Sequence, residues 1–201
     1  MVNAILYLEG GGDSKELHAR CREGFRRLLE QCGFDKQRRM PRLVACGGRN
    51  TAFNDFKIAH ASGKGQFVAL WLDSEDVLSD LERTWAHLES HDAWPQPDGA
   101  SDEQVLFMTT CMETWLVTDR DTLQEHYGGR LHTSALPPLV DLENRARQDV
   151  QHSLAHATRD CSNAYQKGER SFRVFGLLNP TILEKHLPSF ARALRILNAK
   201  L

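Results

Sequence analysis

The sequence predicts an α/β protein of three layers, α/β/α, built around a mainly parallel central sheet of about four strands. The first observation behind this prediction is a continuous apolar run at residues 67–72, typical of a strand buried on both faces of a sheet. The second is the alternation of strand-like and helix-like segments, which favours right-handed crossovers between parallel strands. The third is the length of 201 residues, which fits one domain with its own core.

The first half of the chain repeats a strand followed by a helix. Strands are expected where short apolar runs end in glycine or acidic residues, at residues 4–8, 41–46 and 67–72. The first helix is expected to be capped by Asp13 or Ser14, and the second by Asn50 or Thr51. A third helix is predicted over residues 77–88, because apolar residues recur there at helical spacing.

The second half of the chain is predicted to add one strand and several helices. Residues 92–103 are rich in Pro, Asp, Gly and Ser and are expected to form a surface loop. A fourth strand at 105–109 leads into a helix over 111–127, and further helices are expected at 141–156, 159–168 and 181–198. We therefore divide the chain into an α/β core, residues 1–129, and a helical C-terminal extension, residues 130–201, packed on the same domain.

Composition limits the classes of function. The net charge is -2 and the pI about 6.5, so no bulk positive field favours nucleic acid, although local patches could bind it. The five cysteines are odd in number and lack a CxxC pair, which favours reduced, mostly buried thiols in a cytoplasmic protein. No apolar run approaches the length of a membrane-spanning helix, and no signal peptide is expected.

Acidic residues follow three of the predicted strands. Glu9 ends the first strand, Asp73 and Glu75 follow the third, and Glu113 lies just after the fourth. Neighbouring parallel strands lie about 4.8 Å apart, so Glu9 and Asp73 could share a cation if their strands are neighbours. Oxygen-only ligands suit Mg²⁺ or Mn²⁺, ions that promote phosphodiester hydrolysis. The alternative is that each acid caps a helix or lies in a solvated loop.

Several of these segments resemble a known family. The stretches YLEGGGDS and LWLDSED are similar to the metal-binding motifs of Toprim domains, which occur in topoisomerases, primases and OLD-type nucleases. The later stretches CMETWLVTD and AYQKGERS resemble a bacterial Toprim-like family that is often encoded beside an ABC- or AAA-type ATPase in phage defence.

The resemblance implies roles for particular residues. Glu9 would be a catalytic acid/base or metal ligand, and Asp73 with Glu75 would match the acidic pair that holds Mg²⁺. Glu113 would be a further metal-site acid, and Lys167 would lie near the scissile phosphate. The second acid of the pair is Glu rather than Asp, so Asp76 is left open as its substitute.

The resulting expectation is a Mg²⁺- or Mn²⁺-dependent nuclease that cuts DNA or RNA as the effector partner of an ATPase in anti-phage defence. After the second strand, Arg49, Asn50 and Lys57 are placed to contact nucleic-acid phosphates. The alternative is a non-catalytic Toprim-like adaptor that binds a protein partner or nucleic acid. A homo-oligomer is left open.

Overall fold

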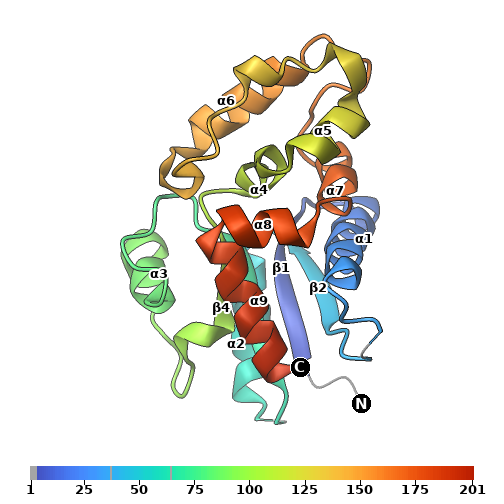
Figure 1. The fold of residues 1–201 in the computed structure, drawn as a ribbon. Coiled ribbons are helices and arrows are strands. Elements are labelled where there is room, and N and C mark those ends of the chain that lie inside the picture. The colour runs from blue at the N-terminus through green and yellow to red at the C-terminus, as the bar shows by residue number, and fades with distance from the viewer. Residues whose placement is uncertain (1–3, 37, 64) are drawn as a thin grey trace.

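A four-stranded, all-parallel sheet forms the centre of the molecule, with strand order β2-β1-β3-β4. The computed structural model describes residues 4–36, 38–63 and 65–201 (Figure 1). The strands are β1 (Ala4–Gly11), β2 (Arg42–Gly47), β3 (Phe67–Asp73) and β4 (Val105–Met108). The predicted fold class, with its parallel sheet flanked by helices and its helical C-terminal stretch, is confirmed.

The register of the sheet aligns the carboxyl ends of its two central strands. Leu8 of β1 pairs with Trp71 of β3, and Asp73 pairs with Met108 of β4. Glu9 comes one residue after the last pair of β1 with β3, at nearly the same level as Asp73, but it lies within β1, which continues to Gly11 beyond the end predicted at residue 8. Because all four strands are parallel, residues that follow them meet at one edge, where ligands bind in open α/β sheets.

Helices cover both faces of the sheet and make two hydrophobic cores. On one face, Trp71 belongs to the larger core, to which several helices contribute: α1 (Lys15–Gln31), α4 (Met112–Thr118), α5 (Arg120–Tyr127), α6 (Arg147–Thr158), α7 (Glu169–Phe175), α8 (Pro180–His186) and α9 (Pro188–Lys200). On the other face, Leu70 and Leu72 pack against α2 (Arg49–Ala61) and α3 (Thr84–Asp92). Apolar residues alternate between these cores along β3 and β4, as the pleat of a doubly covered sheet requires.

The C-terminal segment shares the larger core with the α/β part. Phe175 of α7 packs on Phe25 of α1, with ring centroids 4.7 Å apart, and stacks on Trp115 of α4 at 5.8 Å. Phe190 of α9 meets the same tryptophan edge-on at 5.0 Å. Residues beyond 130 are thus held by aromatic contacts to helices of the first half, not by a separate core.

The helix predicted over residues 77–88 is wrong in its first half, because α3 begins only at Thr84. The chain after β3 stays attached to the segment after β4. Ser74 N–H donates to the Met108 carbonyl at 3.1 Å, and Glu75 N–H donates to the Thr110 carbonyl at 2.9 Å. These bonds and the positive φ of Glu75, 67°, direct the chain away from helical geometry.

Other boundaries also differ from the prediction. The helix expected from Cys111 onward divides at Asp119, whose carboxylate accepts a hydrogen bond from Thr122 N–H and caps α5. The helix expected over 181–198 is two helices, α8 and α9, because Pro188 starts a new one. Residues 159–168 are not helical, α7 was not predicted, and α6 begins at Arg147, not at 141.

The caps of the first two helices follow local hydrogen bonding. Ser14, not Asp13, caps α1, since its hydroxyl accepts from Leu17 N–H at 3.1 Å. The second helix is preceded by Gly48 rather than by Asn50 or Thr51, and it makes no side-chain capping bond.

The outer edge of β4 is covered by a buried arginine of α9. Arg192 is 5% exposed and donates to the Val105 carbonyl at 2.9 Å and to the Asp102 carbonyl at 2.8 Å. Its Nε also donates to Glu82 at 3.0 Å. The guanidinium thereby satisfies backbone acceptors that an edge strand otherwise leaves to solvent.

The thiols are unbridged, as expected. All five cysteines are free, and all but Cys32 are buried. Burial raises the pKa of the thiols of Cys21, Cys32, Cys46 and Cys111 to about 12, which keeps them protonated and weakly nucleophilic. Within the described ranges, no helix is long and apolar enough to cross a membrane.

Candidate functional site

A cavity of about 370 Å³ lies at the carboxyl edge of the sheet, and we call it the acidic cavity. It brings together four of the residues singled out in the sequence: Glu9, Asp73, Glu113 and Lys167. Its remaining lining consists of glycines and apolar side chains: Gly10, Gly11, Gly12, Leu17, Gly47, Met108, Met112, Gly168 and Phe172. Segments up to 158 residues apart in the sequence, from Glu9 to Lys167, therefore build one site.

Glycines allow the walls of the acidic cavity to approach one another. Gly10 has a φ of 129°, and a Cβ there would lie 3.0 Å from the ring of Phe172. Gly47 at the end of β2 has a φ of 73°, and a Cβ there would lie 2.3 Å from the Gly12 carbonyl oxygen. The chain after Glu9 is thus held against both β2 and α7, which fixes where β1 delivers its carboxylate.

Asp73 lies at the base of the acidic cavity, where the strand ends. Its Oδ1 accepts a hydrogen bond of 2.9 Å from the N–H of Met112, the first residue of α4. Burial raises the pKa of Asp73 well above its ordinary value, and the charges of Glu9 and Glu113 raise it further. Lys167 and the Met112 hydrogen bond oppose this rise in pKa without cancelling it. An ionised Asp73 at this position is therefore short of positive charge.

Glu113 is fully buried in the first turn of α4 and is held by two side chains. The Tyr165 hydroxyl donates a short hydrogen bond to Oε1, and Gln151 Nε2 donates to Oε2 at 3.1 Å. Burial raises the pKa of Tyr165, and the charge of Glu113 raises it further, so the phenol remains a donor. The carboxylate is thus oriented by residues of α6 and of the segment before α7.

Glu9 is paired with a largely buried arginine, Arg49. Arg49 Nη1 donates to Glu9 Oε2 at 3.0 Å and to the Asp73 carbonyl at 2.6 Å. The other side of the guanidinium makes two 2.7 Å bonds to the Asp92 carboxylate, and its carbon lies 5.3 Å from the ring centroid of Trp94. Burial raises the pKa of Glu9; Arg49 opposes the rise and the charge of Glu75 adds to it.

The side chain of Glu75 is directed away from the acidic cavity. Its carboxylate forms a short ion pair with Arg147 of α6, and its Oε2 lies 3.9 Å from His91 Nε2. Asp76 lies on the same side, 3.4 Å from His91, with a side chain that is 75% exposed. The structure therefore gathers Asp73 with Glu9 and Glu113, and it places both candidates for the second acid of the pair elsewhere.

The three residues expected to contact phosphate are spread along α2. Arg49 is only 12% exposed and is committed to Glu9 and Asp92. Asn50 is exposed in the first turn of the helix. Lys57 is exposed two turns further on, with its ammonium 4.4 Å from the ring centroid of Phe53. As placed, the three do not form a common surface with Lys167 inside the acidic cavity.

The donor chemistry of the acidic cavity fits a hard divalent cation. Its three carboxylates are oxygen donors, and the pKa of Asp73 is raised by burial and, in addition, by the like charges of Glu9 and Glu113, which a cation would neutralise. In the described part of the chain, however, no three His, Cys, Asp or Glu side chains are grouped closely enough to hold a metal. Each carboxylate instead has a protein partner: Arg49, Met112 N–H or Tyr165. Binding would require side chains to turn from these partners toward the ion.

Two features of the site were not predicted from the sequence: the Arg49–Asp92 ion pair and the Tyr165–Glu113 hydrogen bond. The Arg49–Asp92 ion pair joins residues 43 positions apart, and Asp92 lies at the end of α3 with no pattern that marks it. Tyr165 belongs to the AYQKGERS stretch, but its contact with Glu113 depends on how residues 159–168 cross the site. The only available signal was the polar, aromatic character of that stretch.

Tyr165→Phe is expected to destabilise the protein by about 1–3 kcal/mol, because it removes a donor from a buried carboxylate and leaves Glu113 Oε1 unsatisfied. Urea unfolding at neutral pH measures the change. Tyr7→Phe is the matched control, since it removes the same atom from a partly buried residue on the opposite face of the sheet. Equal effects of the two substitutions would contradict a specific role for the Tyr165–Glu113 bond.

The fold and the site define an all-parallel α/β protein with an acidic cavity at the carboxyl edge of its sheet. Comparison with protein-family models adds a family. The chain belongs to the family described as Domain of unknown function (DUF4276), whose model matches residues 8–198. No curated protein and no solved structure matches the chain. The matched range contains Glu9, Asp73, Glu113 and Lys167, so the whole acidic cavity lies within the family's domain.

Proposed function

We propose that this protein is a Mg²⁺- or Mn²⁺-dependent nuclease that hydrolyses phosphodiester bonds of DNA or RNA. The observation that carries the proposal is the convergence of Glu9, Asp73, Glu113 and Lys167 on one cavity, where burial and then the neighbouring acids raise the pKa of Asp73. Carboxylates with a purely structural role seldom cluster without compensating positive charge, whereas clusters of this kind are common in catalytic sites. The Toprim-like resemblance of the same residues supports this reading.

Each residue has a chemical task in this proposal. Asp73 and Glu113 would hold the divalent ion, and Glu9 would be a third ligand or the acid/base. Such an ion supplies charge neutralisation on the phosphate and activation of the attacking water. The raised pKa of Glu9 brings its proton exchange closer to neutral pH, which suits general acid/base work. The ammonium of Lys167, at the exposed side of the cavity, stabilises negative charge on the phosphate.

A cleavage assay tests the proposal. The protein, alone and with a candidate ATPase, is incubated with labelled DNA and RNA in Mg²⁺, Mn²⁺ or EDTA. Glu9→Gln is expected to lower the cleavage rate by about 10²–10⁴-fold, the usual contribution of a general acid or base. Glu16→Gln is the control, because this side chain is 73% exposed on α1. Full activity of Glu9→Gln, or no cleavage under any of these conditions, would contradict the nuclease. The ATPase partner and the role in anti-phage defence rest on the resemblance alone.

A second candidate is a non-catalytic adaptor that binds a protein partner or nucleic acid. The observation that favours it is the occupancy of the acids by protein cations, Arg49 on Glu9 and Arg147 on Glu75. Thermal unfolding with increasing Mg²⁺ or Mn²⁺ separates the two. If the protein has an ion site, an ion concentration about 100 times the Kd of that site stabilises the folded protein by about 2.7 kcal/mol. An adaptor without an ion site gains none.

A further inference from the structure

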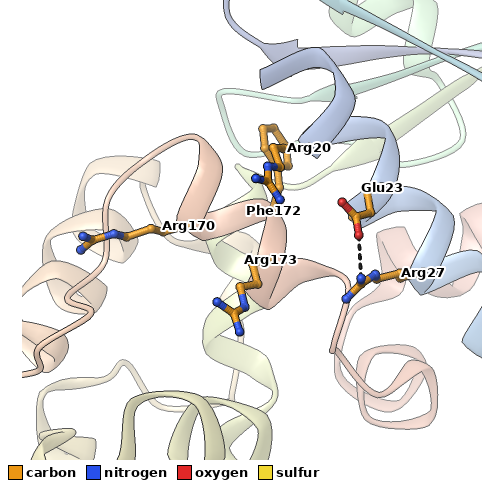
Figure 2. A pocket seen from close by; sticks show the side chains of 7 residues that line it. Arg20, Glu23, Arg27, Arg170, Phe172 and Arg173 are labelled. Atoms are coloured by element: carbon orange, nitrogen blue, oxygen red, sulfur yellow. Dashed lines mark hydrogen bonds and ion pairs between the residues drawn. The ribbon is translucent and has the colours of Figure 1, made fainter. Parts of the chain in front are cut away.

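A second cavity, of about 610 Å³, lies between α1 and α7, and we call it the arginine cavity. Figure 2 shows Arg20 and Arg27 projecting from α1 and Arg170 and Arg173 from α7. The other residues that line it are Glu23, Gly24 and Phe172. Among the side chains that the structure describes, four arginines and one carboxylate line this cavity, in a chain whose net charge is -2. This is the kind of local positive patch that the overall charge conceals. The Arg170 guanidinium points away from Glu23 and donates to the Ala164 carbonyl at 3.1 Å.

In the arginine cavity the backbones of α1 and α7 are in contact, whereas the arginine side chains are partly exposed. A Cβ at Gly24 would lie 2.6 Å from the Phe172 carbonyl oxygen, so α1 and α7 touch through their backbones. Arg27 is 51% exposed and pairs with Glu23 at 2.6 Å, a one-turn ion pair on the helix surface. Arg20 is 46% exposed and lies 3.8 Å from Glu16. An exposed pair such as Arg27–Glu23 is weak, so the Arg27 guanidinium can turn toward a stronger anion.

The two cavities share one lining residue. Phe172 lines both, with its ring against Gly10 of the acidic cavity and its backbone against Gly24 of the arginine cavity. The short stretch from Lys167 to Arg173 supplies Lys167 and Gly168 to one cavity, and Arg170, Phe172 and Arg173 to the other. One short stretch of chain therefore presents cationic side chains to both cavities.

We propose that the arginine cavity binds the phosphodiester backbone of the nucleic-acid strand whose scissile bond lies at the acidic cavity. This inference rests on the proposed nuclease and assigns where its substrate is held. Guanidinium groups match phosphate geometry and are weakly hydrated, which suits them to this contact. Contacts between arginines and phosphates position the strand. They carry no sequence specificity, because the phosphates are the same at every nucleotide.

Binding measurements test this assignment with two matched double variants on one helix. Arg20→Ala/Arg27→Ala removes two arginines of the cavity. Arg22→Ala/Arg26→Ala removes two arginines from a neighbouring hollow that also holds Glu23, Glu30 and Asp35. Fluorescein-labelled single strands of DNA and RNA of about 20 nucleotides are titrated in EDTA at several salt concentrations. The first variant is expected to bind about tenfold or more weakly than wild type and to lower the slope of log K against log salt by roughly 0.7 per lost phosphate contact. The control keeps most of the affinity.

Other outcomes separate this inference from the nuclease itself. Equal affinities of the two double variants would overturn it, as would binding of inorganic phosphate but of neither oligonucleotide. Arginine-dependent binding by a protein that cuts nothing supports the inference while removing the nuclease. Cleavage that is insensitive to Arg20→Ala/Arg27→Ala overturns the inference while leaving the nuclease intact. If the protein binds only the DNA or only the RNA oligonucleotide, the result supports the inference and identifies the substrate.

Discussion

Asp73→Asn is expected to abolish metal-dependent cleavage and, in the same protein, to increase the stability of the metal-free chain. The amide keeps the acceptor for Met112 N–H but removes one of three neighbouring negative charges, those of Asp73, Glu9 and Glu113. Removing a charge that its surroundings disfavour stabilises the folded state. We expect a gain of at least about 1 kcal/mol, which corresponds to roughly 2–4 °C in Tm for a chain of this length.

The gain should depend on pH in a defined direction. A carboxyl whose pKa is raised on folding stabilises the protein fully below its unfolded pKa, about 3.9, and this stability is lost as the pH rises through the folded pKa. Wild type and Asp73→Asn should therefore approach one another in acid and diverge toward neutral and alkaline pH. Urea unfolding in EDTA between about pH 4 and 8 measures this. A variant that is less stable than wild type at neutral pH would show that the ionised carboxylate is structural.

Arg49→Met is expected to destabilise the protein by about 3–5 kcal/mol, the usual cost of removing one partner from buried ion pairs. Glu9 and Asp92 would both lose their cation, while the carbonyl of Asp73 would lose a donor. The flexible Met side chain retains packing against Trp94, so the loss is electrostatic rather than a cavity. Arg22→Met, on the exposed side of α1, is the control and should change stability by less than about 0.5 kcal/mol.

A double variant locates the source of the Arg49 effect. Burial alone would raise the pKa of Asp92, but the hydrogen bonds and charge of Arg49 bring it below its ordinary value. The stability that Asp92 contributes is therefore present above its unfolded pKa, about 3.9, and is lost as the pH falls through the lower folded pKa. Arg49→Met/Asp92→Asn should recover part of the loss and remove this acid-side dependence. Strict additivity of the two single changes would mean that the pair is not coupled.

The strands and their acids could be predicted because they depend on local patterns. The apolar run at 67–72 and the acids that follow three strands are visible in the sequence, and parallel pairing brings Glu9, Asp73 and Glu113 to one edge. The direction of the Glu75 side chain, away from the acidic cavity, could not be predicted. It depends on a left-handed φ imposed by backbone bonds between the ends of β3 and β4. The pairing of Arg49 with Asp92 and the formation of α7 likewise depend on tertiary contacts that no short pattern encodes.

The arginine that lies along β4 also bears on how copies of the chain can meet. A parallel sheet of four strands has two open edges, and an exposed edge is a template for strand addition and aggregation. Arg192 occupies the Val105 carbonyl, and its buried charge would have to be withdrawn before a foreign strand could pair there. Arg192 therefore opposes the addition of a strand at the β4 edge.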